Sequence, residues 1–364
     1  MSGNIDKIQA PLSKPKPRVS ISPTNPRQFV QNFSFHNCKR GNQGFQRLLL
    51  QVFGYTGHGL SSFINTCKIV WDNSAYNNYT KASGSYGGNT MDRLTYQLTE
   101  NIILVDNRGC AVMRSHEKGE IFAQLGNLLP LGQAVQGTRG FELLDRIFKS
   151  EKLVKYSDFI VPVYVHSVGH PIFPDEMNEL KNIFQAAGRL TGIYPIVVLT
   201  HKNSGFLTTV ESSFRDMGVE KIFALENYTP EDHLKTRGRH EEVMKFLYEV
   251  IKNAKFRVEH ETCDPVKHMH ENTQFVMNYV HEREKKMEQE NLEKRKAFER
   301  TWREKEVKRQ EEALERERQR GREAEEDLRK KIEDLERQRS ADQARHEEEL
   351  KNAKKKKKNF RKKK

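Results

Sequence analysis

Residues 53–62, with the sequence FGYTGHGLSS, combine glycines and hydroxyl side chains at the spacing of a phosphate-binding loop. In the Walker A pattern, G-x-x-x-x-G-K-[ST], backbone amides and a lysine hold phosphates while the hydroxyl binds Mg²⁺. Gly54, Gly59 and Ser61 match this spacing, whereas Leu60 stands where the lysine belongs. An apolar run precedes the loop and a helix-compatible run follows it, which is the context that the motif requires. The pattern therefore predicts a nucleotide-binding frame whose chemistry is impaired.

Further polar sequences follow the loop, each at the end of an apolar run. Asp106 and Gly109 form a D-x-x-G sequence after one run, and residues 200–203 (THKN) and Glu226 follow two others. Ligands bind outside the carboxyl ends of the strands in open α/β sheets. We therefore expect these polar residues to gather around the glycine loop.

The elements that must position these residues alternate between strand-like and helix-like runs over residues 28–255. The apolar and β-branched runs predict strands at 48–53, 92–99, 101–105, 159–166, 193–200 and 220–225, the second and third forming a hairpin around Glu100. Helical spacing predicts helices at 61–70, 120–129, 175–190, 210–217 and 231–254. Such alternation is typical of an α/β fold with a mostly parallel sheet flanked by helices.

The order of these motifs resembles that of the P-loop GTPase domain over about residues 40–255. Among its branches the chain looks most like the immunity-associated and interferon-induced GTPases, the interferon-induced protein 44 group and the immune-associated nucleotide-binding group. Those proteins pair a G domain with helical or coiled extensions. The resemblance implies a P-loop NTPase fold of the G-domain kind, with GTP or GDP and Mg²⁺ as cofactors.

The resemblance also assigns roles to individual residues. It implies phosphate binding by Gly54, Gly57, His58, Gly59, Leu60, Ser61, Ser62 and Gly109. It implies contact with the base by Thr200, His201, Lys202, Asn203 and Glu226. It implies Mg²⁺ binding by Ser61, Asp106 and the switch threonine Thr90, for which Thr80 is nearly as good a candidate.

Departures from the GTPase pattern weaken the expected chemistry. Leu60 cannot neutralise phosphate charge as a lysine does, and Asn203 offers guanine a neutral amide in place of a carboxylate. Cys110 occupies the position at which some GTPases keep a water-orienting glutamine. We expect His58 to face solvent in the loop rather than to take part in catalysis. For Leu60 two alternatives stay open: the loop keeps its shape, or Leu60 packs into the core and the loop collapses.

These observations predict a nucleotide-dependent switch that binds GTP or GDP weakly, with little or no hydrolysis. Ordering of the segments near Thr90 and Gly109 by a γ-phosphate would change contacts with a partner. The alternative is a nucleotide-free scaffold that associates through its helix and tail. A third hypothesis is an ATP-binding P-loop protein, which D-x-x-G and THKN disfavour.

Composition divides the chain outside this domain. Residues 1–27 carry five prolines and few apolar groups, which predicts a disordered leader. The four cysteines lack paired spacing, which favours reduced thiols in a cytoplasmic protein. The sequence contains neither an apolar stretch of membrane-spanning length nor a signal-peptide core, in keeping with that location.

The last third of the chain is dominated by charge. Residues 270–350 consist almost entirely of helix-forming residues, with sparse and irregularly spaced apolar residues, which predicts a long charged helix. A weak coiled coil that forms a homo-oligomer and a solvated single helix both stay open. Residues 351–364 contain ten basic and no acidic residues, out of a net charge of +13. This basic tail could bind an anionic membrane or nucleic acid, serve as a nuclear import signal, or only solvate the chain. The protein partner of such a switch is not evident from the sequence.

Overall fold

The computed structural model describes residues 25–80, 93–107, 109–110, 115–133 and 140–361. The chain separates into two units, residues 1–285 and residues 286–364. The first unit contains the sheet and the helices around it, and the second contains most of one long helix. Each unit is described by itself below.

The first unit is built on a six-stranded sheet with the order β2-β3-β1-β4-β5-β6. The strands are β1 (Arg47–Gly54), β2 (Leu94–Thr99), β3 (Ile102–Asp106), β4 (Asp158–Ser167), β5 (Ile196–Thr200) and β6 (Ile222–Ala224). Among the described strands, only β2 runs antiparallel to its neighbour, and its pairing with β3 confirms the predicted hairpin. All other pairings are parallel. The expected α/β fold with a mostly parallel sheet is therefore confirmed.

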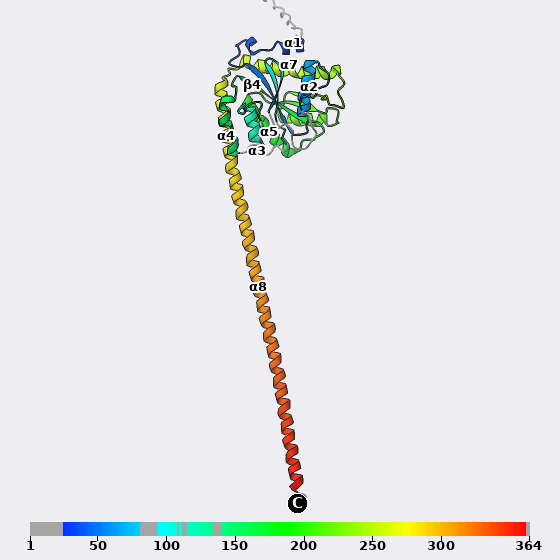
Figure 1. The fold of residues 1–364 in the computed structure, drawn as a ribbon, viewed down its shortest axis with the longest axis vertical. Helices are drawn as coiled ribbons and strands as arrows, with labels where there is room; N and C mark the ends of the chain where they lie inside the picture. Colours follow the sequence, from blue (N-terminus) through cyan, green and yellow to red (C-terminus); the bar gives the residue numbers. More distant parts are fainter. Residues whose placement is uncertain (1–24, 81–92, 108, 111–114, 134–139, 362–364) are drawn as a thin grey trace, which may run out of the picture. The chain divides into compact units, whose positions relative to one another are not determined.

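Helices cover both faces of this sheet (Figure 1). One face packs against α1 (Pro26–Gln31), α2 (Leu60–Asp72) and α7 (Arg237–His260). The other packs against α3 (Ser115–Leu125), α4 (Gly140–Ser150), α5 (Pro174–Thr191), α6 (Leu207–Asp216) and the start of α8 (Pro265–Arg361). Two short 3-10 helices, Phe35–Asn37 and Glu151–Leu153, join these elements. The strands are buried on both sides, which explains their continuous apolar runs.

Several predicted boundaries were wrong for local reasons. The helix expected at 231–254 begins at Arg237, because the Thr236 side chain accepts a hydrogen bond from the amide of Arg239 and caps it. The helix expected at 120–129 ends at Leu125, before Gly126. The helix α1 begins at Pro26, inside the segment expected to be disordered. The helix α4 was not predicted; it buries Leu143 and Ile147 and exposes Asp145 between them.

The expected long charged C-terminal helix is confirmed as α8, which spans 97 residues. Asp264 accepts hydrogen bonds from the amides of Val266 and Lys267, which caps its start. Within the first unit, Val276 and Val280 of α8 are buried in the core beside α3 and α5. From 286 to 355 the helix is exposed apart from the half-buried Glu306. No described helix is long and apolar enough to cross a membrane.

Candidate functional site

The glycine loop joins β1 to α2 at the carboxyl end of the sheet. Gly57 and Gly59 adopt left-handed backbone angles, with φ of 84° and 85°. Gly59 is the N-cap of α2 and has no side chain with which to cap the first-turn amides of that helix. The amides at such a helix start carry partial positive charge and suit an anion. Leu60, Ser61 and Ser62 form this first turn.

Two glycines of the loop are required by close packing. A Cβ at Gly54 would lie 2.4 Å from the carbonyl oxygen of Val165 in β4. A Cβ at Gly59 would lie 3.0 Å from the side-chain nitrogen of Asn227, which itself donates to the Gly59 carbonyl oxygen at 3.3 Å. The loop is therefore held in place by the carboxyl end of β4 and by the segment that follows β6.

Ser61 and Asp106 meet beneath the loop. The Ser61 hydroxyl donates a hydrogen bond of 3.1 Å to Oδ2 of Asp106, which is 1% exposed. Burial raises the pKa of Asp106 to about 7, and the hydrogen bond from Ser61 opposes the shift. The second carboxylate oxygen, Oδ1, is buried and has no hydrogen-bond partner among the described residues. A hydroxyl beside an unsatisfied carboxylate oxygen is a donor set that fits Mg²⁺.

Leu60 packs into the core instead of reaching over the loop. It is 6% exposed and belongs to the apolar cluster between the sheet, α2 and α7. Its Cδ1 lies 3.4 Å from the place that a Cβ of Gly54 would occupy. The structure therefore combines parts of the two alternatives for Leu60: its side chain is packed, while Gly57 and Gly59 keep the left-handed backbone of the loop.

The D-x-x-G segment lies against the loop. The amide of Thr56 donates to the carbonyl oxygen of Cys110 at 2.9 Å, and the amide of Cys110 donates to the carbonyl oxygen of Gly54 at 3.0 Å. A Cβ at Gly109 would lie 3.1 Å from Cα of Thr56. Gly109 and Cys110 therefore close one side of the glycine loop.

His58 is buried, so the expectation that it faces solvent was wrong. It is 7% exposed, and its ring stacks on His170 at 4.6 Å and meets His166 edge-on at 4.7 Å. Its Nδ1 accepts a hydrogen bond of 3.2 Å from the amide of Ser167. Burial, followed by the neighbouring histidines, lowers the pKa of His58 to about 3. Burial likewise lowers the pKa of His166 to about 4, so both rings are neutral near pH 7.

The segment after β5 brings its polar residues to the same carboxyl ends of the strands as the glycine loop. The buried Thr200 hydroxyl donates to the carbonyl oxygen of His58 at 2.8 Å. His201 has a φ of 55°, and its Nδ1 lies 3.1 Å from the hydroxyls of Ser167 and Thr200. The amide of Asn203 donates to Glu226 at 2.8 Å, which joins the two segments predicted to read a base. Lys202 instead forms an ion pair with Glu242 of α7.

The two candidate switch threonines have different outcomes. Thr90 lies outside the described residues. Thr80 is buried, and its hydroxyl donates to the carbonyl oxygen of Ser61 at 3.1 Å. Its amide donates to the side chain of Asn65 in α2 at 2.8 Å. Thr80 therefore supports the start of α2 from below.

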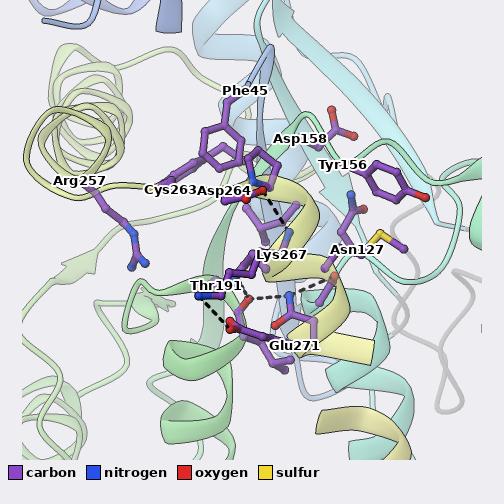
Figure 2. Close-up of a pocket in the computed structure, with 18 of the residues that line it drawn as sticks. Phe45, Asn127, Tyr156, Asp158, Thr191, Arg257, Cys263, Asp264, Lys267 and Glu271 are labelled. Carbon is purple, nitrogen blue, oxygen red and sulfur yellow. Dashed lines mark hydrogen bonds and ion pairs between the residues drawn. The ribbon is translucent and has the colours of Figure 1, made fainter. Parts of the chain in front are cut away.

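A cavity of about 410 Å³ lies at the other end of the strands, where β4 begins (Figure 2). Its wall includes Asp158, Lys267 and Glu271, and many of its polar groups are already paired within the protein. Asp158 binds Arg47 at 2.7 Å, and Asn272 donates to the carbonyl oxygen of Leu190 at 2.9 Å. Those predicted site residues that the structure describes lie at the carboxyl ends of the strands, so this cavity is not part of the candidate site. Within the described ranges no group of three His, Cys, Asp or Glu side chains could hold a metal ion.

Strand order, glycine loop and aspartate together define the class of fold. The loop follows β1 at the centre of the sheet, Asp106 ends the adjacent β3, and β2 is the antiparallel edge strand. This arrangement is that of a P-loop NTPase of the G-domain kind, followed here by a long charged helix. The predicted fold class is confirmed.

Comparisons with known proteins add little to this assignment. No family model and no curated protein matches the chain. Among solved structures, the chain is similar to a crystal structure described as a "probable GTP-binding protein engB". The identity is 14%, the match covers 58% of this chain and 98% of the other, and the TM-score is 0.28. A TM-score this low supports no inference, so the fold class rests on the topology above.

The structure adds residues that the motifs alone did not identify. His166 and Ser167 at the end of β4 hold His58, and Asn227 holds Gly59. The signal was present, because a predicted strand ended at His166 and ligands gather at strand ends. Thr56 was hidden because it is a variable position of the Walker A pattern.

Proposed function

We propose that this protein is a GTPase-like switch that binds GTP or GDP with Mg²⁺ weakly and hydrolyses GTP slowly or not at all. The observation that carries the proposal is the pairing of Ser61 with a buried Asp106 whose second oxygen has no partner in the described part of the chain. An unpaired buried carboxylate oxygen is costly, and a cation provides its natural partner. The pair lies beside the uncapped start of α2, so anion and cation sites adjoin.

In this proposal the phosphates contact backbone amides. The first turn of α2 and the left-handed Gly57 and Gly59 would direct N–H groups at a diphosphate. Ser61 and Asp106 would hold Mg²⁺, which neutralises phosphate charge. Position 60 supplies no cation to the phosphates, because its residue is a leucine that packs in the core. We expect affinity to be reduced accordingly.

The segment after β5 would recognise the base. Glu226 holds the amide of Asn203, and the segment leaves the sheet at the edge that carries the loop. An asparagine side chain can donate to and accept from a purine, but it lacks the charge that favours guanine over adenine. Preference for guanine should therefore be modest.

Slow hydrolysis follows from the residues around the loop. Cys110 occupies the water-orienting position, and its side chain is buried. His58 and His166 are neutral, but both are packed under the loop, with His58 holding the amide of Ser167. The buried thiol of Cys110 and these two packed, neutral rings supply no general base to an attacking water, which supports a switch with little turnover.

Switching would act through Gly109 and Cys110. These residues now contact Thr56 and Gly54 directly. A third phosphate between the loop and Gly109 requires the two hydrogen bonds of Cys110 to break. GTP and GDP would then favour different positions of this segment, as in switches that order or release a loop. The immunity-associated type of GTPase is part of this proposal and rests on the motif order and the long helix.

A nucleotide-free scaffold is the second candidate. It is favoured by the packed Leu60 and by the closure of Gly109 on Thr56. Association would then depend on α8 and the basic tail.

Calorimetry on the full chain distinguishes the two candidates. Titration with Mg²⁺-GTP, Mg²⁺-GDP and Mg²⁺-ATP should give weak binding with a small preference for guanine. The Asn203→Asp variant should raise that preference, because the carboxylate accepts two hydrogen bonds from guanine. No heat with any nucleotide at millimolar concentration would leave the scaffold as the function.

A further inference from the structure

The exposed part of α8 carries a regular apolar stripe. Apolar spacing is irregular over residues 270–350 as a whole, but from Val307 onward it follows a seven-residue repeat. Val307, Leu314, Leu328 and Leu335 occupy this repeat, with Gly321 at the intervening position. Ile332 lies between the last two, four residues after one and three before the other. These five side chains are 49–63% exposed, with Leu314 the least and Leu335 the most exposed.

We propose that α8 forms an antiparallel coiled coil with α8 of a second copy of this chain over residues 307–339. The seven-residue positions are then the d positions, and Glu311, Arg318, Glu325, Ile332 and Arg339 are the a positions. The sequence left a homo-oligomer through residues 270–350 open; this interface gives it a segment, an orientation and a number of copies. It does not depend on the proposed nucleotide site.

Charge at the a positions decides the orientation. In a parallel pair in register, each a residue meets its own copy, which opposes Glu311 to Glu311 and Arg318 to Arg318. An antiparallel pair centred near Glu323 brings each a residue to a d residue instead. Ile332 then packs on Leu314, and Arg318 packs its apolar stem on Leu328. Arg318 also lies one layer from Glu325 of the second copy, which offsets its charge.

Charges beside the stripe favour the same alignment. Lys308 faces Glu336, Glu315 faces Arg329, and Glu317 faces Lys331 of the second copy, each pair occurring twice by symmetry. One contact is unfavourable, because Arg322 faces its own copy at the centre. Within each helix Oε1 of Glu315 lies 2.9 Å from Nη2 of Arg322, and this ion pair reduces the repulsion between the two arginines. The balance of charge is complementary over the whole pairing.

The basic tails point to the same orientation. A parallel pairing would bring two copies of the segment 351–364, each with ten basic residues, side by side. Antiparallel pairing keeps the two segments apart. Because the stripe has only five apolar residues a chain, the dimer should be weak and sensitive to salt.

Cross-linking the full chain tests the orientation. The double variant Leu314→Cys/Ile332→Cys is oxidised, digested and mapped by mass spectrometry. Antiparallel pairing predicts disulfides between position 314 and position 332, since facing a and d residues meet disulfide geometry. Links of 314 to 314 and 332 to 332 would indicate a parallel pair and overturn the proposal. The wild-type chain, with its own four cysteines, is the control.

Exchange of charges tests the alignment by sedimentation. Glu317→Lys alone should weaken the dimer about fivefold to tenfold, because two ion pairs become repulsive. The double variant Glu317→Lys/Lys331→Glu should recover most of the affinity only in the antiparallel alignment. In a parallel pair Glu317 faces Arg322 and Lys331 faces Glu336, so the double variant would be weaker than either single variant.

A matched control exchanges two charges on the outer side of the helix. Glu312→Lys/Lys330→Glu alters two ion pairs within the helix, Glu312 with Arg316 and Lys330 with Glu326. It should leave the dimer unchanged. Circular dichroism shows whether any variant loses helix. A chain that stays monomeric at 100 µM (about the concentration at which a weak coiled coil associates) would overturn the proposal.

Discussion

Leu60 is the residue at which this chain departs most from a phosphate-binding loop. A lysine at the first helical position would supply a cation to the phosphates, but here the position is used to fill the core between α2 and α7. The loop nevertheless keeps its left-handed glycines and the paired Ser61 and Asp106. Loss of the cation and retention of the cradle are therefore separate features of the site.

Leu60→Lys should destabilise the protein without nucleotide. The 6% exposed side chain would be replaced by a charge at the edge of the core, which should lower the free energy of unfolding by about 2–4 kcal/mol. Saturating Mg²⁺-GDP should recover part of this loss, because the ammonium group can then bind phosphate. Denaturant unfolding with and without nucleotide measures both effects. Leu60→Met is the control, and equal stability of the lysine variant would contradict the packed position.

His58 should make stability depend on acid. Its pKa is about 3 in the folded protein and about 6.5 when unfolded, so the unfolded chain binds the extra proton between these values. The contribution of His58 to stability is therefore fully present above pH 6.5 and is lost as the pH is lowered from 6.5 towards 3. His166 adds a similar contribution. The His58→Asn variant keeps an acceptor for Ser167 and should show a shallower fall between pH 6.5 and 4.5. The same slope in both proteins would show that His58 is not buried.

At the scale of elements, a buried arginine fixes the D-x-x-G segment to the sheet. Arg93 is fully buried, and burial lowers its pKa to about 9. It donates to the side chains of Asn107 at 3.0 Å and Gln51 at 3.1 Å, and to the carbonyl oxygen of Leu129. Asn107 follows Asp106 directly and donates to the carbonyl oxygen of Val52 at 3.0 Å. The network thus holds the segment that must move in the proposed switch.

Arg93→Met should cost about 3–5 kcal/mol of folding free energy, because it leaves several buried acceptors without donors. The control Arg237→Met alters an exposed ion pair and should change stability by less than about 0.5 kcal/mol. Thermal and denaturant unfolding measure both variants. A small loss for Arg93→Met would show that the network does not fix this segment.

Much of the element order could be predicted from the sequence. Continuous β-branched runs such as 159–166 mark buried parallel strands, and the glycine loop marked the connection from a strand to a helix. The buried state of His58 could not be predicted, because it depends on His166, His170 and Ser167, which are distant in sequence. The position of Leu60 was left open, since packing decides it. The start of α7 was missed because a single capping side chain, Thr236, sets it.

At the scale of the whole molecule, composition separates a folded domain from a charged helix and tail. The two units defined by contacts divide at Lys285, although α8 itself begins at Pro265. The first turns of α8 belong to the core of the domain, and its remainder is available for association. The roles of the domain and of the helix can therefore be tested apart.

Deletion of residues 351–364 should abolish most binding to anionic vesicles or RNA and leave unfolding of the domain unchanged. The ten basic residues would supply this attraction at about 1 kcal/mol per charge near a lipid surface. Vesicle co-sedimentation and RNA binding, each at low and physiological salt, distinguish the two surfaces. Equal binding by the truncated chain, or binding that ignores salt, would remove the tail as the determinant. Nuclear accumulation of the full chain but not of the truncated one would indicate an import signal instead.

Nucleotide binding through Ser61 and Asp106 is the central claim, and calorimetry at two pH values tests it most directly. Mg²⁺ requires the ionised carboxylate, and the pKa of Asp106 is about 7. Binding of Mg²⁺-GDP by the full chain should therefore be tighter at pH 8 than at pH 6. The Asp106→Asn variant should lose both the Mg²⁺ dependence and the pH dependence. It should also be more stable than the wild type at pH 8, because the wild type then buries an unpaired charge. Binding that is unchanged by Asp106→Asn, or absent at both pH values, would contradict the account.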